Sequence, residues 1–203
     1  TLFAQNYPQN LYEVILVNDF SEDNTLEMAN SFVFKGLKVI DLKNHFSNHE
    51  AITAHKKTAL ALAIAQSRGE VILTTDADCL LPPNWIKTML APFYKSEVVF
   101  VTGPVVFDPN TTFLQKVVAL DFCGMMVTTG ASVISGLSNM SNGANLGYLK
   151  SAFETVNGFE GINHLASGDD LLLMEKMTKH YGMDKVAFVK SKEAVVSTLP
   201  PEN

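Results

Sequence analysis

Two aspartates one residue apart, Asp76 and Asp78, follow the apolar segment 71–75. On an extended segment, residues i and i+2 point to the same side, so these carboxylates would repel each other unless a positive charge lay beside them. A divalent cation that carries a diphosphate meets that need, because Mg²⁺ or Mn²⁺ is held by carboxylates together with phosphate oxygens. A solvated acidic turn before Pro82-Pro83 is the alternative interpretation.

Asp19 and Lys56 are candidates for contacts with a nucleotide. Asp19 follows the apolar segment 12–18, and its carboxylate could accept a hydrogen bond from a nucleobase N–H; an Asx turn is the alternative. Lys56 begins the Ala- and Leu-rich segment 56–67, which is typical of a helix. A cation there opposes the helix dipole, so contact with a phosphate or a base would account for its position, as would simple solvation.

Asp169 and Asp170 precede a helix predicted over 170–180. Carboxylates in a first turn stabilise a helix in any case, and Ser167 with Asp170 resembles a cap. The functional hypothesis is a general base that takes a proton from a hydroxyl group. Asn145 lies in the polar, glycine-containing stretch 143–147, which could line a pocket or form an ordinary turn.

The elements around these residues alternate between strands and helices. Strands are predicted over 12–18, 37–42, 71–75 and 98–102, and helices over 24–34, 56–67 and 84–94. This order predicts an α/β fold with a mostly parallel sheet covered on both faces. The carboxyl ends of parallel strands meet at one edge of the sheet, so we expect Asp19, Asp76 and Asp78 to converge there.

Two further patterns have a structural interpretation. Residues 117–137 are apolar enough to suggest a membrane span, but Asp121 and the scattered small polar residues favour a buried or amphipathic helix. His45, His49 and His55 match no familiar zinc spacing, so we expect them to be solvated.

The amino-acid composition excludes several classes of protein and partner. The 203 residues are 47% apolar and 18% charged, which excludes a disordered chain. The net charge of −6 provides no global basic field, so a nucleic-acid partner is not expected. Two cysteines, Cys79 and Cys123, are too few for a disulfide framework, and no segment reads as a secretory signal. A cytoplasmic location follows as the expectation.

The order of the motifs resembles that of family 2 glycosyltransferases over nearly the whole chain. The segments that carry the resemblance are 12–25 (YEVILVNDFSEDNT), 56–60 (KKTAL), 69–78 (GEVILTTDAD), 142–146 (NGANL) and 168–170 (GDD). The resemblance implies a GT-A fold, a Rossmann-like sandwich, with residues 1–203 as one domain. Residues 1–104 would be its nucleotide-sugar half and 105–203 its acceptor half. It further implies inverting transfer of a sugar from a nucleotide-sugar, commonly linked to UDP.

The resemblance also assigns roles on the donor side. Asp19 would contact the uracil, Lys56 the nucleotide, and Asp76 the ribose or base side. Asp78 would bind the metal, Mg²⁺ or Mn²⁺.

On the acceptor side, Asp170 would be the general base with Asp169 beside it, and Asn145 would help to position a glycan or lipid-linked acceptor. Phe20 departs from the pattern, because the family often has glycine there. The family's first strand should lie upstream of Thr1. Any membrane helices of the parent protein would lie outside this chain, and this domain would then lie at the cytoplasmic face of a membrane. A nucleotide-sugar-binding module without turnover and a nucleotidyltransferase of similar fold remain the alternatives.

Overall fold

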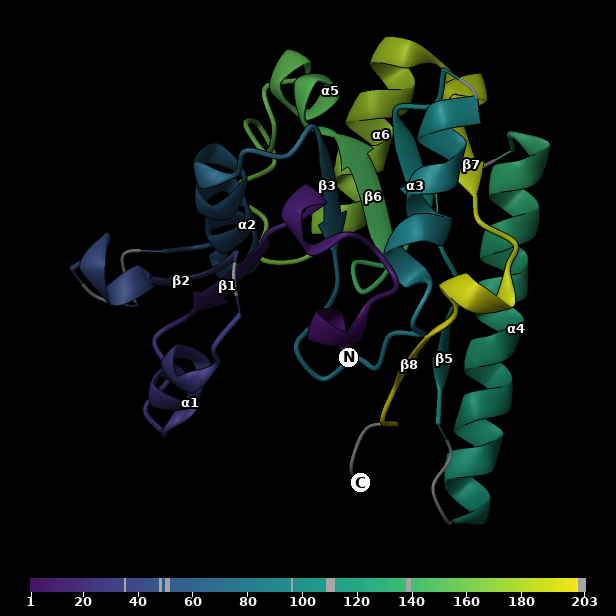
Figure 1. The fold of residues 1–203 in the computed structure, drawn as a ribbon. Coiled ribbons are helices and arrows are strands. Elements are labelled where there is room, and N and C mark those ends of the chain that lie inside the picture. The colour runs from purple at the N-terminus through teal and green to yellow at the C-terminus, as the bar shows by residue number, and fades with distance from the viewer. Residues whose placement is uncertain are drawn as a thin grey trace.

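The computed structural model describes residues 1–34, 36–47, 49, 52–95, 97–108, 112–137 and 140–200. Its strands are β1 (Val14–Asn18), β2 (Leu37–Asp41), β3 (Val71–Thr74), β4 (Phe100–Thr102), β5 (Val105–Phe107), β6 (Leu146–Leu149), β7 (Val186–Phe188) and β8 (Val196–Thr198). Its α-helices are α1 (Thr25–Ser31), α2 (His55–Gln66), α3 (Trp85–Lys95), α4 (Phe113–Ser135), α5 (Lys150–Thr155) and α6 (Asp169–Tyr181). Short 3₁₀ turns are η1 (Leu2–Ala4), η2 (Gln9–Leu11), η3 (Leu42–Asn44), η5 (Met183–Lys185) and η6 (Lys192–Ala194). Figure 1 shows these elements as layers of helices around the strands.

The predicted strands and helices of the first half are confirmed within a few residues. Within the described residues the strands form three groups, β1–β2, β3–β6–β4–β7 and β5–β8. The pairs β1–β2, β4–β7 and β5–β8 are parallel, which agrees with the predicted α/β class. Strand β6 was not predicted, and it runs antiparallel between β3 and β4. Its sequence, Leu-Gly-Tyr-Leu, follows a polar stretch that reads as a loop.

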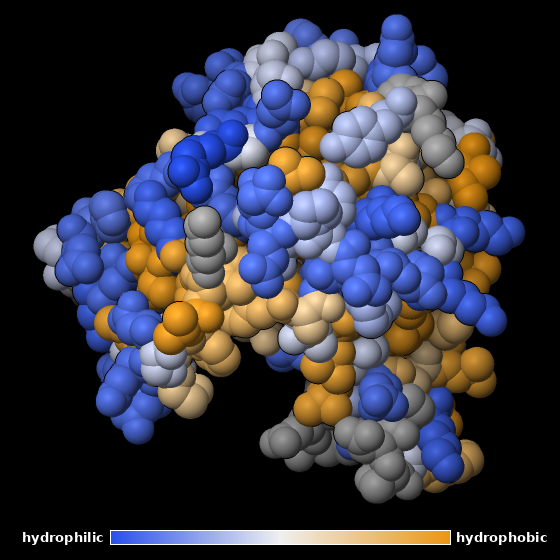
Figure 2. Space-filling view, viewed as in Figure 1, coloured by the Kyte–Doolittle hydropathy of each residue, from blue (hydrophilic) through white to orange (hydrophobic). Residues whose placement is uncertain are grey.

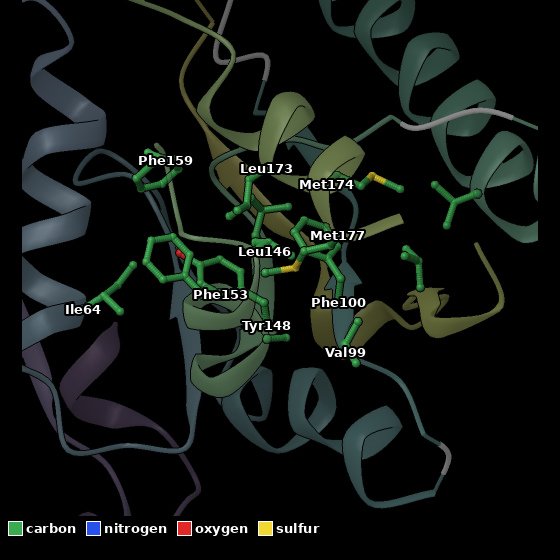
Figure 3. Packing of buried hydrophobic residues seen from close by; sticks show 14 residues of the cluster. Ile64, Val99, Phe100, Leu146, Tyr148, Phe153, Phe159, Leu173, Met174 and Met177 are labelled. Atoms are coloured by element: carbon green, nitrogen blue, oxygen red, sulfur yellow. The ribbon is translucent and has the colours of Figure 1, made fainter. Parts of the chain in front are cut away.

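Two apolar clusters hold the sheet and its helices together. The first surrounds the central strands and is shown in Figure 3, where Phe100, Leu146, Tyr148, Phe153 and Met177 meet between β4, β6, α5 and α6. The second lies beside α3 and the β5–β8 pair, and its members include Trp85, Met89, Val101, Val105 and Val196. Burying one such large side chain contributes about 1.5–3 kcal/mol, so these clusters fix the strand ends that carry the polar site.

Helix α4 differs from its prediction. It is long and apolar enough to cross a membrane, but one side packs on β5 and β7 through Met126, Thr129 and Val133, with Gly130 against the Phe188 ring. The rest of the helix is exposed, although much of it is apolar; its exposed large side chains are Phe113, Leu114, Val117, Leu120, Met125, Val127 and Ile134. Figure 2 shows apolar residues on this side of the molecule. The helix is therefore neither buried nor amphipathic, because both of its sides carry apolar residues.

Candidate active site

The first turn of α2 connects the ends of β1 and β3. His55 Nδ1 lies 2.8 Å from Oδ1 of Asp19, which follows β1. Lys56, the next residue, places its Nζ 2.8 Å from Oδ1 of Asp76, which follows β3. The third cation, Lys57, reaches the loop before α6 and is completely buried. All three side chains have specific partners, which accounts for basic residues at the unfavourable end of the helix dipole.

Lys56 also brings the acidic motif of α6 to this edge. Its Nζ lies 3.8 Å from Oδ2 of Asp169, so one ammonium group stands between two carboxylates from distant segments. The charges and the hydrogen bond outweigh the opposing effect of burial, and the pKa of Lys56 is raised. A Cβ on Gly143 would lie 3.1 Å from Lys56 Nζ and 3.4 Å from Asp169 Oδ2, so the absence of a side chain there leaves room for this pair.

Asp169 and Asp170 occupy the first turn of α6, as predicted. The cap itself differs: Gly168 is the N-cap, with φ +75°, and Ser167 makes no side-chain cap. Burial raises the pKa of Asp170, and the neighbouring Asp169 charge adds to the effect, against backbone N–H groups that lower it. A carboxyl group with a raised pKa is a stronger base when ionised, which suits proton removal from a hydroxyl.

Asp78 is held from the far end of the chain. Thr198 in β8 donates a hydrogen bond from its hydroxyl to Oδ2 of Asp78 at 2.9 Å. Two backbone hydrogen bonds between Leu80 and Ser197, 2.7 and 3.0 Å long, fix β8 beside the same turn. The sequence analysis did not single out Thr198, because no local signal links it to Asp78.

Asn145 does not fit the role that the resemblance implies. Its side chain is completely buried, with an exposed fraction of 0%. The amide nitrogen donates to the carbonyls of Pro104 (2.8 Å) and Ala194 (2.7 Å), and the amide oxygen accepts from Trp85 Nε1 at 2.9 Å. This network joins β6 to α3, β5 and η6, so Asn145 and Trp85 are core residues in this structure and do not face an acceptor.

Two of the three histidines lie together beside Asp19. The ligand atoms of Asp19, His49 and His55 lie within 4.8 Å of one another; His49 is exposed, as expected, whereas His55 is half-buried and bonded to Asp19. The His49 and His55 rings are stacked at 3.8 Å, with the Phe20 ring edge-on to both. Imidazole nitrogen is a common metal ligand but a poor one for Mg²⁺, which prefers oxygen. The three groups could hold a metal ion, and beside Asp19 the rings of Phe20, His49 and His55 form an aromatic wall.

Phe20 has a positive φ of +56°. This backbone conformation favours glycine, which explains in physical terms why the resemblance places glycine at this position. Here the aromatic ring contacts instead the two histidines, so the strained backbone and the aromatic wall occur at the same residue.

Comparison with known proteins decides the family. The model of glycosyl transferase family 2 matches residues 1–156. The chain belongs to glycosyl transferase family 2. Among curated relatives of this family 2 chain, the glycosyltransferase AglE of Haloferax volcanii is 26% identical over 179 residues, which are 86% of this chain and 54% of AglE. N-acetylgalactosaminyltransferase 7 of Drosophila melanogaster is 36% identical over 100 residues, 47% of this chain and 15% of that protein.

Solved structures agree on the fold of this family 2 chain. S. aureus TarS 1-349 in complex with UDP-GlcNAc aligns with a TM-score of 0.70 at 16% identity, over 100% of this chain and 53% of the other. The mannosyltransferase PcManGT of Pyrobaculum calidifontis, in complex with GDP-Man and Mn²⁺, aligns with a TM-score of 0.68 at 21% identity, over 100% and 52%. The fold is GT-A, as predicted, and the chain spans about half the length of AglE and of these structures.

Proposed function

We propose that the chain forms the catalytic centre of an inverting glycosyltransferase that moves a sugar from a nucleotide-sugar, of the UDP-linked class, to an acceptor hydroxyl group. The observation that carries the proposal is the position of Lys56, whose ammonium group lies between Asp76 and Asp169. This lysine brings the carboxylate expected on the nucleotide side next to the motif expected to activate the acceptor. Donor and acceptor chemistry would then meet at one edge of the sheet.

The donor half, residues 1–104, would hold the nucleotide through the ends of β1 and β3. Asp19 offers a carboxylate to a nucleobase N–H, beside the wall formed by His49 and His55. Lys56 and Asp76 lie further along the same edge, where the ammonium group can reach a phosphate and the carboxylate a ribose hydroxyl. A TarS structure contains UDP-GlcNAc and a PcManGT structure contains GDP-Man, which supports a nucleotide-sugar donor here.

The residues present fit a divalent cation. Asp78 is exposed at the end of the β3 turn, and its carboxylate is oriented by Thr198 while keeping free lone pairs. Carboxylate oxygen is the ligand that Mg²⁺ and Mn²⁺ prefer, and PcManGT was solved with Mn²⁺. When bound, the ion would screen the diphosphate charge and so stabilise it as a leaving group. Lys56 already balances the charge of Asp76, which leaves Asp78 as the metal ligand.

The acceptor half, residues 105–203, would supply the base. Asp170 takes the proton from the acceptor hydroxyl, whose oxygen attacks the anomeric carbon as the bond from that carbon to the diphosphate breaks and the nucleoside diphosphate leaves. Asp169 is held beside Asp170 by Lys56. Burial keeps the pKa of Asp170 above that of an ordinary aspartate, which strengthens it as a base. The acceptor is proposed to be a glycan or a lipid-linked molecule, and the location the cytoplasm, at a membrane through parts outside this chain.

Calorimetry with UDP and Mn²⁺ tests the donor site in the wild type, in Asp78→Ala and in Asp121→Ala, which removes an exposed aspartate of α4 as the matched control. We expect Asp78→Ala to lose the metal-dependent part of binding and Asp121→Ala to keep it. A UDP-release assay with a mixture of UDP-sugars then tests turnover, which Asp170→Asn should abolish while it still binds UDP. Equal metal-dependent binding by wild type and Asp78→Ala would contradict the metal assignment.

A further inference from the structure

Lys57 has an unusual environment for a lysine. Its side chain is 1% exposed, although lysine is among the residues least often buried completely. Its Nζ donates to two backbone carbonyls, those of Leu165 and Ser167, both at 2.6 Å. Within the described part of the chain no carboxylate lies within ion-pair distance of this ammonium group, so two carbonyl dipoles alone offset its desolvation.

The two acceptors stand directly before the acidic motif. Gly168, which follows Ser167, is the N-cap of α6 in a left-handed conformation, and Asp169 and Asp170 come next. Among the described residues, the two bonds from Lys57 are the hydrogen bonds that tie 161–168 to a distant part of the chain; the others run within 157–172. The loop that sets the position of both aspartates is therefore fixed by one side chain of α2.

We propose that Lys57 is the positioning residue for the acidic motif: it holds the backbone of 165–168 so that Asp170 faces the donor edge. Lys56 and Lys57 would act together, one on the Asp169 side chain and one on the main chain before it. The effect on turnover rests on the proposed function. The two hydrogen bonds from Lys57 to this loop, called the Lys57 clamp below, can be tested without turnover.

The chain provides a matched control. Lys176 in α6 also donates to two carbonyls, those of Gly158 (2.6 Å) and Glu160 (2.7 Å), at the opposite end of the α5–α6 connection. Lys176→Met removes the same kind of contact from the same loop, but at the end away from Asp170. The comparison with Lys57→Met therefore separates positioning of the motif from a general loosening of the loop.

The first experiment measures amide hydrogen exchange, UDP binding and turnover in the full chain. In Lys57→Met we expect faster exchange over 165–172, a kcat reduced about 10- to 100-fold, and a UDP affinity close to that of the wild type. In Lys176→Met the faster exchange should be confined to 158–162, with kcat within about twofold of the wild type. Unchanged exchange over 165–172 in Lys57→Met overturns the proposal. Faster exchange over 165–172 in Lys57→Met, with no turnover of a nucleotide-sugar by the wild type, would support the positioning role of the Lys57 clamp and contradict the proposed turnover by this chain.

The second experiment uses chemical rescue. Lys57 lines an open cleft of about 610 Å³ between α2 and the residues after α5, so a small amine has access to its position. Propylamine carries the three carbons and the ammonium group that Lys57→Ala lacks. If Lys57→Ala is folded, propylamine should restore the protection of 165–172 from exchange and raise kcat in proportion. If Lys57→Ala is unfolded, propylamine should restore a folded state that unfolds cooperatively. Tetramethylammonium, a cation without N–H donors, should restore neither, and equal rescue by both cations would overturn the hydrogen-bond role.

Discussion

The hydroxyl group of Thr198 donates to the carboxylate of Asp78 across 120 residues of sequence, at 2.9 Å. This contact ties β8 to the turn that carries Asp78, the metal ligand proposed above. A hydrogen bond from a neighbour fixes the orientation of a carboxylate, and second partners of this kind commonly change metal affinity by about 10- to 100-fold.

We therefore expect Thr198→Val to weaken Mn²⁺-dependent UDP binding by about tenfold. Thr198→Ser keeps the hydroxyl group and should stay within about twofold of the wild type, as measured by calorimetry over a series of Mn²⁺ concentrations. Equal affinities for Thr198→Val and Thr198→Ser would show that the hydroxyl group has no part in holding Asp78.

Lys56→Met removes the cation between Asp76 and Asp169. The two carboxylates then lose their shared partner, so UDP affinity should fall by about tenfold, equivalent to about 1.4 kcal/mol. Lys56→Arg keeps the charge and should retain most of the binding. The control is Lys38→Met at an exposed position of β2, which should bind UDP like the wild type; a similar loss in Lys38→Met would mean that net charge, not this site, sets the affinity.

The pH profile of turnover should show an acid limb that belongs to Asp170. Its pKa is raised by burial, so kcat should fall at a higher pH than the value of about 3.9 for an unperturbed aspartate. The Lys56 charge favours the ionised form of Asp170, because the two groups interact electrostatically. Lys56→Met should consequently move the acid limb to still higher pH, and a limb that stays in place would exclude Asp170 as the group that titrates.

The raised pKa of Asp170 also predicts how the stability of the fold depends on pH. Since the pKa of Asp170 is higher in the folded than in the unfolded chain, its contribution to stability is fully present below the unfolded pKa and is lost as pH rises through the folded pKa. Asp170→Asn removes the unfavourable charge, so its Tm at pH 7 should exceed that of the wild type by about 1–3 °C. The difference should disappear in thermal scans near pH 3, where both side chains are neutral.

Asn145→Ala should behave as a core substitution. It leaves the indole N–H of Trp85 and the carbonyl of Ala194 without the partners seen here, while Pro104 keeps its bond from the Val196 N–H, which should cost about 2–4 kcal/mol of unfolding free energy in urea titrations. Asn10→Ala, at an exposed position, is expected to cost under about 0.5 kcal/mol. If Asn145→Ala were as stable as Asn10→Ala and had lost acceptor binding, that result would support the role in positioning the acceptor that the resemblance implies.

The sequence predicted the parts of the site that depend on local order. Asp19 and Asp76 follow strands whose apolar runs are unambiguous, and α2 joins the ends of these strands through His55 and Lys56. A cation at the start of α2 opposes the helix dipole; the sequence left a ligand contact and simple solvation open, and the structure gives Lys56 a carboxylate partner instead.

Contacts that depend on long-range packing could not be predicted in this way. Asn145 lies in a stretch that reads as a loop, yet a neighbouring antiparallel strand carries it into the core. Thr198 and Lys57 acquire their roles from partners more than 100 residues away. Ser167 matches a capping pattern, but its backbone carbonyl and not its hydroxyl makes the important contact. Residue type and local spacing do not predict such long-range contacts.

The first turn of α2 gives three consecutive residues three different partners, so all three contacts depend on one helix register. One residue inserted or deleted ahead of this turn would rotate the helix face by about 100° and misdirect His55, Lys56 and Lys57 together. Substitutions among them should combine non-additively, because each partner helps to keep the helix in the register that the other two need. The length of the loop before α2 is therefore constrained more tightly than the composition of that loop.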